Sequence, residues 1–300
     1  MSKKFEKIFL QFLPYLNINQ SASWNQAVQY LSTFFTPSVN ENSKPTKSTI
    51  VPKSREKSII RSHFLNIDFN LEYGIEPTSR QEYEKCIETF NSWFDLDVEN
   101  LNKVSQGNPL VAIAWYIIRE LKFIETFDFN PVELLRFLYH IENKYNKDTP
   151  YHNNLHAADV THSVYNLLKI PEIYNNLTDV DKFALIISAV CHDVDHTGFT
   201  NMFLVKTTHQ HALCYNDRSV QENHHSALAF ELMQVEGLDT IVQSLQDINE
   251  WSYFRDTVIE IILGTDMSLH GEHMEALESM VDECDMCSHK TRIDVMKSIM

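Results

Sequence analysis

Glycine and positive charge are both scarce in this chain. Only 6 of its 300 residues are glycine, about 2% against a usual ~7%. That argues against glycine-rich phosphate loops, Rossmann turns and β architectures with many tight turns, and it favours helices. The formal net charge is −16, which excludes a nucleic-acid polymer bound over a broad basic face. A small anionic substrate would need local positive charge, which a bound metal ion can provide.

Long hydrophobic runs and paired cysteines are also missing. The longest apolar runs, Leu110–Ile118 and Phe183–Cys191, are far shorter than the ~18 residues of a membrane span. The 5 cysteines are few and odd in number, which indicates a reducing compartment rather than a disulfide framework. We therefore expect a cytoplasmic protein without a transmembrane segment, which could still be peripheral to a membrane.

The first part of the chain differs in composition from the rest. Residues 37–60 are rich in Ser, Thr, Asn, Lys and Pro, which predicts a linker or a disordered segment. Apolar residues at helical spacing between positions 5 and 13 predict a short docking helix, with a partner or membrane surface as the alternative. We expect residues 1–60 to form this N-terminal segment and residues 61–300 to form one domain.

From about residue 80 the hydrophobic pattern is helical and strand signals are weak, which predicts a compact all-α, multi-helix domain. Asn130 and Pro131 are typical of an N-cap and a first helical position, and they predict a helix over 132–144. Thr178 and Asp181 resemble a capping box that opens the buried helix ending near Cys191.

A second capping-box pattern, Ser219-x-x-Glu222, predicts a helix that stops at Gly237. A further helix is expected over about 252–263. Glu222 has two compatible interpretations: it is the capping residue, or its carboxylate holds a metal-bound water.

Histidine is the residue that this sequence has in excess, and 9 of its 14 histidines lie between positions 152 and 225. A single histidine is more often a satisfied core or surface residue than a ligand, but a cluster interleaved with Asp and Glu favours metal chemistry. His152 and His156 are four residues apart, so a helical segment would aim both at one site.

The second histidine motif, His192-Asp193-Val-Asp195-His196, directly follows the buried apolar run. Ionisable groups at the end of a buried helix are costly unless they are paired or bind a metal. An adjacent His–Asp pair supplies one nitrogen and one oxygen, and the carboxylate can bridge two ions.

Two further patterns are weaker indications of a functional site. A Thr-Asp pair such as Thr265-Asp266 usually only marks a helix end, so it suggests a site only in combination with the other motifs. Cys284-x-x-Cys287 with His289 resembles half of a zinc site, but no second CxxC accompanies it and we do not expect it to bind metal.

Four ordered strings, YHNNLHAADV, HDVDHTG, YNDRSVQENHH and GTDMSLH, resemble the catalytic domain of mammalian-type 3′,5′-cyclic-nucleotide phosphodiesterases. The similarity runs from about residue 85 to residue 300. It implies a compact all-helical domain that holds two divalent metal ions, zinc and magnesium (or manganese), and takes a cyclic nucleotide as substrate.

The resemblance also implies roles for individual residues. His152 matches the general acid that protonates the leaving O3′ atom. His156, His192 and Asp193 match ligands of the tighter metal, and Asp193 also bridges to the second. Tyr151 matches an aromatic side chain near the nucleotide, so Tyr151, His152 and Asp193 are the expected substrate contacts.

Three more residues match positions that hold metal-bound waters or orient the acid, namely His196, Glu222 and Asp266. Asp159 also follows the family pattern, although a structural hydrogen bond is the role we expect for it. The implied reaction is hydrolysis of cyclic AMP, cyclic GMP or both to the 5′-monophosphate, by a hydroxide that two metals activate.

The sequence departs from the family pattern near its end. The family has a further Asp just after the helix that here covers 292–300, and Asp294 is too early and in a different context to replace it. The glutamine and aromatics that hold the base are expected later still. We therefore expect a C-terminally incomplete domain with little activity of its own, either a fragment of an active enzyme or a short, non-catalytic homologue that binds a partner or a nucleotide.

Two other enzyme classes fit less well. An HD-type phosphohydrolase acting on other phosphoesters would explain the His–Asp pair but not the string HNNLHAADV. An extracellular zinc protease would need the Glu of an HExxH motif, which HDVDH lacks. The oligomeric state stays open.

Overall fold

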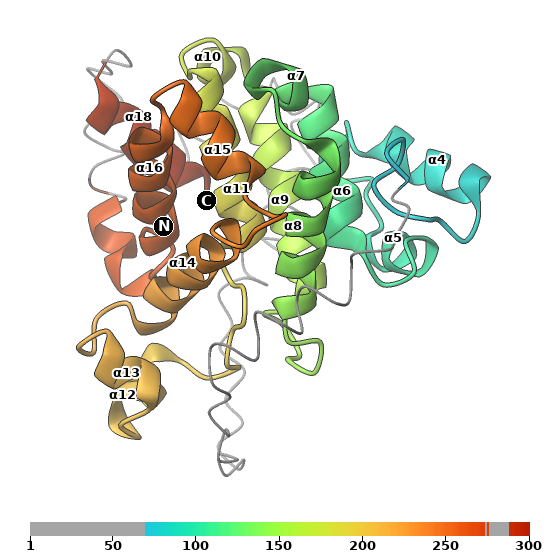
Figure 1. Cartoon of the computed structure of the whole chain (residues 1–300). Helices are drawn as coiled ribbons and strands as arrows, with labels where there is room; N and C mark the ends of the chain where they lie inside the picture. Colours follow the sequence, from blue (N-terminus) through green and yellow to red (C-terminus); the bar gives the residue numbers. More distant parts are fainter. Residues whose placement is uncertain (1–69, 274, 276–287) are drawn as a thin grey trace, which may run out of the picture. The chain divides into compact units, whose positions relative to one another are not determined.

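The computed structural model describes residues 70–273, 275 and 288–300. The predicted N-terminal segment 1–60, with its apolar stripe, lies outside the described residues, as does the Cys284-x-x-Cys287 pair. The boundary near residue 60 therefore stays a prediction. The described residues form helices and contain no β-strand, which confirms the all-α fold (Figure 1).

The helices follow one another through short connections. In chain order they are α4 (Arg80–Thr89), α5 (Val98–Val104), α6 (Pro109–Glu120), α7 (Phe123–Phe127), α8 (Pro131–Lys144), α9 (Asn154–Leu168), α10 (Pro171–Tyr174), α11 (Asp179–Cys191), α12 (Asn201–Lys206), α13 (Gln210–Cys214), α14 (Val220–Met233), α15 (Thr240–Asp247), α16 (Trp251–Leu263), the 3₁₀ helix η2 (Met267–Leu269) and α18 (His289–Ile299). None of these described helices is long and apolar enough to cross a membrane.

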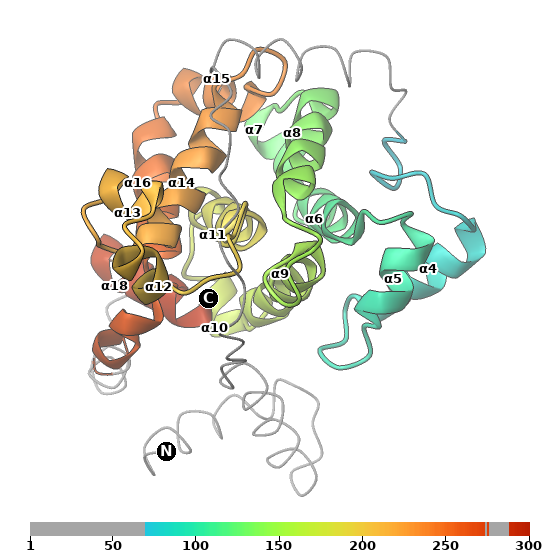
Figure 2. The ribbon, with the colours of Figure 1, turned by 90° about the horizontal axis from the view of Figure 1, so that it is seen from below.

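Helix α11 is the centre of the core. It packs against α9 on one side and against α16 on the other, and Figure 2 shows α11 between these two helices. Every residue from Val180 to Cys191 is buried, and Phe183 makes ring contacts with Phe123, Phe129 and Phe254. Because this buried helix cannot shift without opening the core, the residues at its C-terminal end are held rigidly.

A buried carboxylate joins three other helices. Glu142 of α8 accepts hydrogen bonds from the backbone N–H groups of Leu110 (3.0 Å) and Val111 (3.1 Å) in the first turn of α6. The same carboxylate accepts a hydrogen bond from Nδ2 of Asn154, at the start of α9, at 2.9 Å. These three hydrogen bonds attach α8 to the first turns of α6 and α9, so Glu142 fixes how the three helices meet.

Two of the predicted helix starts are confirmed. The side chain of Asn130 accepts from the N–H groups of Val132 and Glu133 ahead of α8. The Thr178 hydroxyl accepts from the N–H of Asp181, and the Asp181 carboxylate accepts from the N–H of Thr178, which completes a capping box.

The capping box predicted at Ser219 is wrong. Ser219 has a left-handed backbone (φ 39°) and makes no side-chain cap, because its hydroxyl instead donates to Oδ2 of Asp266 at 2.8 Å. Helix α14 also ends at Met233, before Gly237, since the next N–H groups bond to carbonyls three residues back rather than four. The helix expected over 252–263 is confirmed as α16.

Candidate metal centre

His152 and His156 approach one site, but not from one helix. Asn153 is the N-cap of α9, and its side chain accepts from the N–H groups of Leu155 (3.0 Å) and His156 (3.3 Å). His152 therefore precedes the helix, and the prediction that a helical segment carries both histidines is wrong. Their rings still lie 5.8 Å apart between centroids, because the turn before the cap folds His152 back toward His156.

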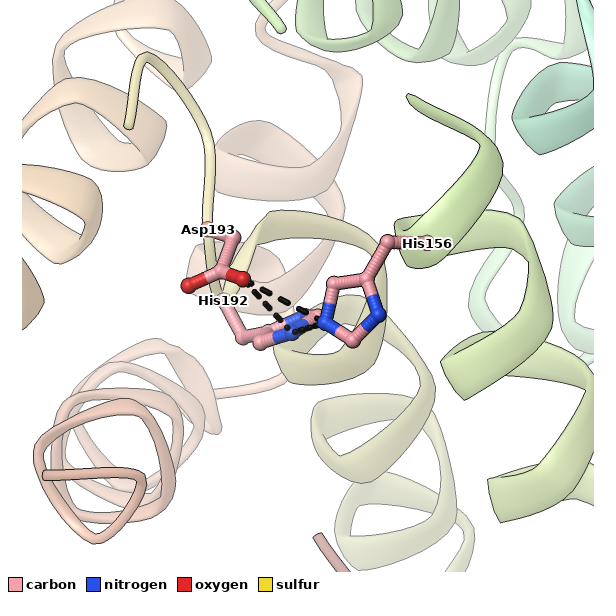
Figure 3. A group of neighbouring side chains, drawn as sticks. All are labelled: His156, His192 and Asp193. Atoms are coloured by element: carbon pink, nitrogen blue, oxygen red, sulfur yellow. Dashed lines mark hydrogen bonds and ion pairs between the residues drawn. The ribbon is translucent and has the colours of Figure 1, made fainter. Parts of the chain in front are cut away.

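His192 and Asp193 reach the same place from the end of α11. Nε2 of His192 lies 3.2 Å from Nε2 of His156. Oδ2 of Asp193 lies 3.4 Å from each of these two nitrogens. The three side chains point toward one another in Figure 3, and all are at most 13% exposed. The structure therefore brings together all three residues predicted to bind the tighter metal.

The chemistry of these donors fits a divalent metal ion. Nδ1 of His192 lies 2.9 Å from the carbonyl oxygen of Ala189, so Nδ1 carries the proton and Nε2 presents its lone pair to the site. Histidine ligands commonly donate their other N–H to a backbone carbonyl in this way. Two imidazole nitrogens and one carboxylate oxygen are the donor types that zinc prefers.

A second group shares Asp193. His196 and His225 each place a ligand atom within reach of its carboxylate, and Nε2 of His225 lies 3.7 Å from Oδ1 of Asp193. Nδ1 of His225 lies 2.6 Å from the carbonyl oxygen of Val194, which again leaves Nε2 facing the site. Sequence reasoning assigned no role to His225, although its place three residues after Glu222 put it on the same face of α14.

The electrostatics of the site centre on the same carboxylate. Burial alone would raise the pKa of Asp193, but the His192 and His156 rings hold it well below its usual range. Burial lowers the pKa of His152, and it lowers that of His196 to about 3 and that of His225 to about 4. Burial lowers the pKa of His192 less than the charge and hydrogen bond of Asp193 raise it, so its net shift is upward. The site therefore combines an anionic carboxylate with the neutral rings of His196 and His225, and a metal ion bound at His192 would take the place of a proton.

The predicted Glu222 and Asp266 are in neither group of clustered ligand atoms among the described residues, and both have other hydrogen-bond partners. Glu222 accepts from Nδ2 of Asn201 at 2.8 Å, and burial, followed by the charges of Asp266 and Asp193, raises its pKa. Asp266 accepts from Ser219, as described, and caps η2 by accepting from the N–H of Ser268 at 2.9 Å. The capping role considered for Glu222 is thus wrong, while Asp266 does begin a helix.

Tyr151 lies at the mouth of the site and is 41% exposed. Its ring centroid is 4.5 Å from that of His156 and 4.9 Å from that of His152. Partial burial, with the charges of Asp159 and Asp193, raises the pKa of Tyr151 to about 12, so the phenol stays protonated.

Other histidines of the cluster have different surroundings. Nε2 of His162 lies 3.0 Å from the carbonyl oxygen of Phe90 within the core. Nε2 of His224 lies 2.8 Å from Oδ2 of Asp195, and its ring stacks on that of His211 at 3.9 Å. These histidines therefore make structural contacts near the centre, and they are not part of the group drawn in Figure 3.

Residues 151–300, half of the chain, match the family described as 3′5′-cyclic nucleotide phosphodiesterase. The chain belongs to this family. The match begins at Tyr151, directly before His152, and includes every site residue described above. The phosphodiesterase family thus accounts for the fold and for the order of the four histidine-containing strings.

Named relatives extend the similarity over more of the chain. The 3′,5′-cyclic-AMP phosphodiesterase 4C of Mus musculus is 33% identical over 311 residues, covering 99% of this chain and 45% of the relative. A 3′,5′-cyclic-AMP phosphodiesterase (isoform F) of Drosophila melanogaster is 36% identical over 210 residues, covering 70% of this chain and 31% of the relative. The chain thus spans about half the length of the mouse relative, and less of the fly protein.

Proposed function

We propose that this chain provides the catalytic centre for hydrolysis of a 3′,5′-cyclic nucleotide to the 5′-monophosphate. The observation that carries the proposal is the convergence of His156, His192 and Asp193 on one point in a member of the phosphodiesterase family. Cyclic AMP is the first substrate to test, because the relatives described above are named for it; cyclic GMP is the second.

His156, His192 and Asp193 are the proposed ligands of the tighter ion, for which zinc suits the two nitrogens and one oxygen. Asp193 presents its other oxygen toward the side of His196 and His225, so the second ion, magnesium or manganese, is proposed there. When bound, such a pair of ions activates the attacking water and neutralises charge on the phosphoryl oxygens.

His152 is the proposed general acid. Its ring lies against both His156 and His196 and near the charge of Asp193, which supports a place beside the proposed phosphate position and outside the group of Figure 3. Opening the cyclic ester leaves an alkoxide at O3′, and a placed histidine that protonates it typically contributes ~10²–10⁴-fold. Tyr151, at the mouth, is the proposed contact of the nucleoside.

His196, Glu222 and Asp266 are proposed to position water around the centre. Each is held by a hydrogen bond to a neighbour from another segment. Such outer contacts orient ligands and waters, and their loss typically costs 10–100-fold in affinity or activity.

The test is hydrolysis of cyclic AMP and of cyclic GMP by the purified chain supplied with zinc and magnesium. His152→Ala is assayed beside it, with His270→Ala, which alters an exposed histidine outside the site, as the matched control. Turnover that His152→Ala abolishes and His270→Ala preserves supports the proposal. Binding of the nucleotide without turnover, under zinc, magnesium or manganese, would overturn it for this chain, and is the result expected of an incomplete domain or of a non-catalytic homologue.

A further inference from the structure

We propose that Gln221 is a positioning residue, which holds the ring of His196 against His152 and thereby fixes the orientation of the proposed general acid. The catalytic part of this inference rests on the proposed function. The structural part, a clamp from α14 onto the loop after α11, rests on the contacts of Gln221 alone.

The side chain of Gln221 is buried, at 5% exposure, and both ends of its amide are bonded. Oε1 accepts from the backbone N–H of Thr197 at 3.1 Å and from the Thr197 hydroxyl at 2.7 Å. Nε2 donates to the carbonyl oxygen of Phe199 at 2.7 Å and lies 2.8 Å from Nε2 of His196. One amide therefore contacts three residues of the loop that carries His196.

These partners fix the direction of the amide. A backbone N–H only donates and a carbonyl oxygen only accepts, so Thr197 must face the oxygen and Phe199 must face the nitrogen. The atom of Gln221 that meets His196 is consequently an N–H donor. A donor on one defined side of an imidazole restrains the ring's position and rotation, which an apolar side chain of the same size would not do.

The opposite edge of the same ring faces the loop itself, where the backbone nitrogen of Gly198 lies 3.0 Å from Nδ1 of His196. A neutral imidazole accepts a hydrogen bond at one nitrogen and carries its proton on the other, so His196 cannot accept from both Gln221 and Gly198. We assign the acceptor to Nε2 and the restraining hydrogen bond to Gln221.

The clamp reaches His152 through ring stacking. The rings of His196 and His152 are stacked at 4.0 Å between centroids, with an interplanar angle of 17°. The ring of His225 lies on His196 at 5.7 Å and 23°. Because His152 precedes the N-cap of α9, the helix does not fix its ring, and His196 provides the flat surface against which it rests.

The clamp is also tied to a proposed water-positioning residue. Asn201 accepts from the backbone N–H of Gln221 at 3.0 Å and donates to Glu222 at 2.8 Å. The start of α14 is therefore attached at two successive residues to Asn201, the first residue of α12, while the Gln221 amide contacts the loop before α12 and touches an imidazole.

The test replaces Gln221 by Leu, which keeps the approximate volume and removes the amide. Histidine-ring NMR is recorded on the full chain without metal, with the signals of His152 and His196 assigned through His152→Asn and His196→Asn. We expect Gln221→Leu to shift the ring signals of both histidines. The matched control Gln243→Leu, at an exposed amide on α15 that bonds to Asp239, should shift neither. Unchanged His152 signals in folded Gln221→Leu would overturn the proposal.

A double variant separates positioning from a purely structural role. Gln221→Leu alone leaves the Thr197 hydroxyl without its acceptor, and Thr197→Val combined with Gln221→Leu removes both side-chain partners of that bond. The double variant also loses the longer, 3.3 Å hydrogen bond from the Phe199 N–H to the Thr197 hydroxyl. We expect the double variant to have a higher melting temperature than the single variant, and to fold if the single variant does not. Its His152 ring signals should still be displaced from their wild-type positions. Recovery of the wild-type His152 signals would mean that Gln221 only satisfies Thr197, which overturns the proposal.

Activity provides the second measurement. We expect Gln221→Leu to lower kcat ~10–100-fold with little change in KM for cyclic AMP, since small misplacements of a reacting group have effects of this size. An unchanged kcat would contradict the inference. If the wild-type chain does not hydrolyse cyclic nucleotides, the proposed function fails, and the NMR comparison still decides whether Gln221 positions the two rings.

Discussion

Asp193 is the side chain that the two groups of possible metal ligands share. One of its oxygens faces His156 and His192, and the other faces His225. The Asp193 side chain is 13% exposed, so its negative charge lies at a point that is nearly closed to solvent. Such a charge is costly to bury without a partner, so the residue-scale geometry favours a cation at this point.

His152→Ala should lower kcat/KM for a cyclic nucleotide by ~10²–10⁴-fold, about 3–5 kcal/mol of transition-state stabilisation. Bound metal should be retained, because His152 is outside the group that includes His156, His192 and Asp193. Steady-state kinetics and metal analysis of the same preparation check both parts. A large loss of bound metal would show that His152 is a ligand rather than the acid.

The residues of Figure 3 could be predicted from the sequence because each lies inside a short motif whose residue types and spacing indicate metal binding. His225 and Gln221 could not be assigned in this way. Their roles depend on the packing of α14 beside the loop after α11, across 31 and 25 residues of chain respectively. No local pattern shows which carbonyl or imidazole a buried amide will meet.

At the scale of elements, the helices are held together by a few buried polar side chains as well as by apolar packing. Two similar four-residue capping patterns show how such polar contacts depend on the rest of the fold. Thr178 and Asp181 form the predicted capping box, whereas Ser219 adopts a left-handed backbone and bonds to Asp266 instead. The difference is tertiary, since Asp266 approaches Ser219 from a segment 47 residues away, and a capping pattern alone cannot reveal it.

Glu142 predicts a specific pH dependence of stability. Burial raises its pKa to about 7 from an ordinary value of about 4.3. Between these values the folded state holds a proton that the unfolded state releases, so the free energy of unfolding should fall as pH rises from about 4 to 7, by about 3 kcal/mol in total.

The comparison that isolates this effect is urea unfolding of wild type and Glu142→Gln at several pH values. The amide does not titrate, while all other groups are common to both proteins. The difference in stability should therefore change across this window and become constant above pH ~7. Parallel pH profiles for the two proteins would show that the Glu142 carboxyl titrates normally despite its burial.

Helix α18 is attached to the core through Arg292. Its Nε lies 3.0 Å from Oδ2 of Asp181, which is fully buried in α11, and its Nη2 donates to Tyr253 of α16 at 3.0 Å. Arg292→Met should destabilise the fold by about 3 kcal/mol, because it removes the cation from a buried carboxylate.

Lys297→Met on the same helix is the matched control. Its partner Glu260 is 51% exposed, and exposed ion pairs contribute under ~1 kcal/mol. Chemical denaturation of both variants measures the contrast. The Tyr253 hydroxyl also donates to Oδ1 of Asp181. Equal, small effects would mean that the capping box and this hydrogen bond stabilise Asp181 sufficiently without Arg292.

For the whole molecule, the dominant facts are a net charge of −16 and a centre assembled from separate parts of the chain. His156 comes from α9, His192 and Asp193 follow α11, and His225 comes from α14. The all-helical arrangement could be predicted from glycine scarcity and hydrophobic periodicity. The way in which these helices converge could not, because it depends on long-range packing around α11.

An ion held between these helices should stabilise the entire fold, since the unfolded chain cannot present the same ligands together. Zinc at about 100 times its dissociation constant adds ~2.7 kcal/mol, which corresponds to a rise of roughly 5–10 °C in Tm for a domain of this size. Thermal melts of the chelator-treated chain, with and without zinc, measure the shift.

Two variants locate the ion that causes this shift in Tm. Asp193→Asn should abolish most of the shift, because this variant lacks the one carboxylate of the group. Replacing Cys284 and Cys287 together by Ser should leave the shift intact. The opposite pattern would place the stabilising ion at the cysteine pair and contradict the assignment of this centre.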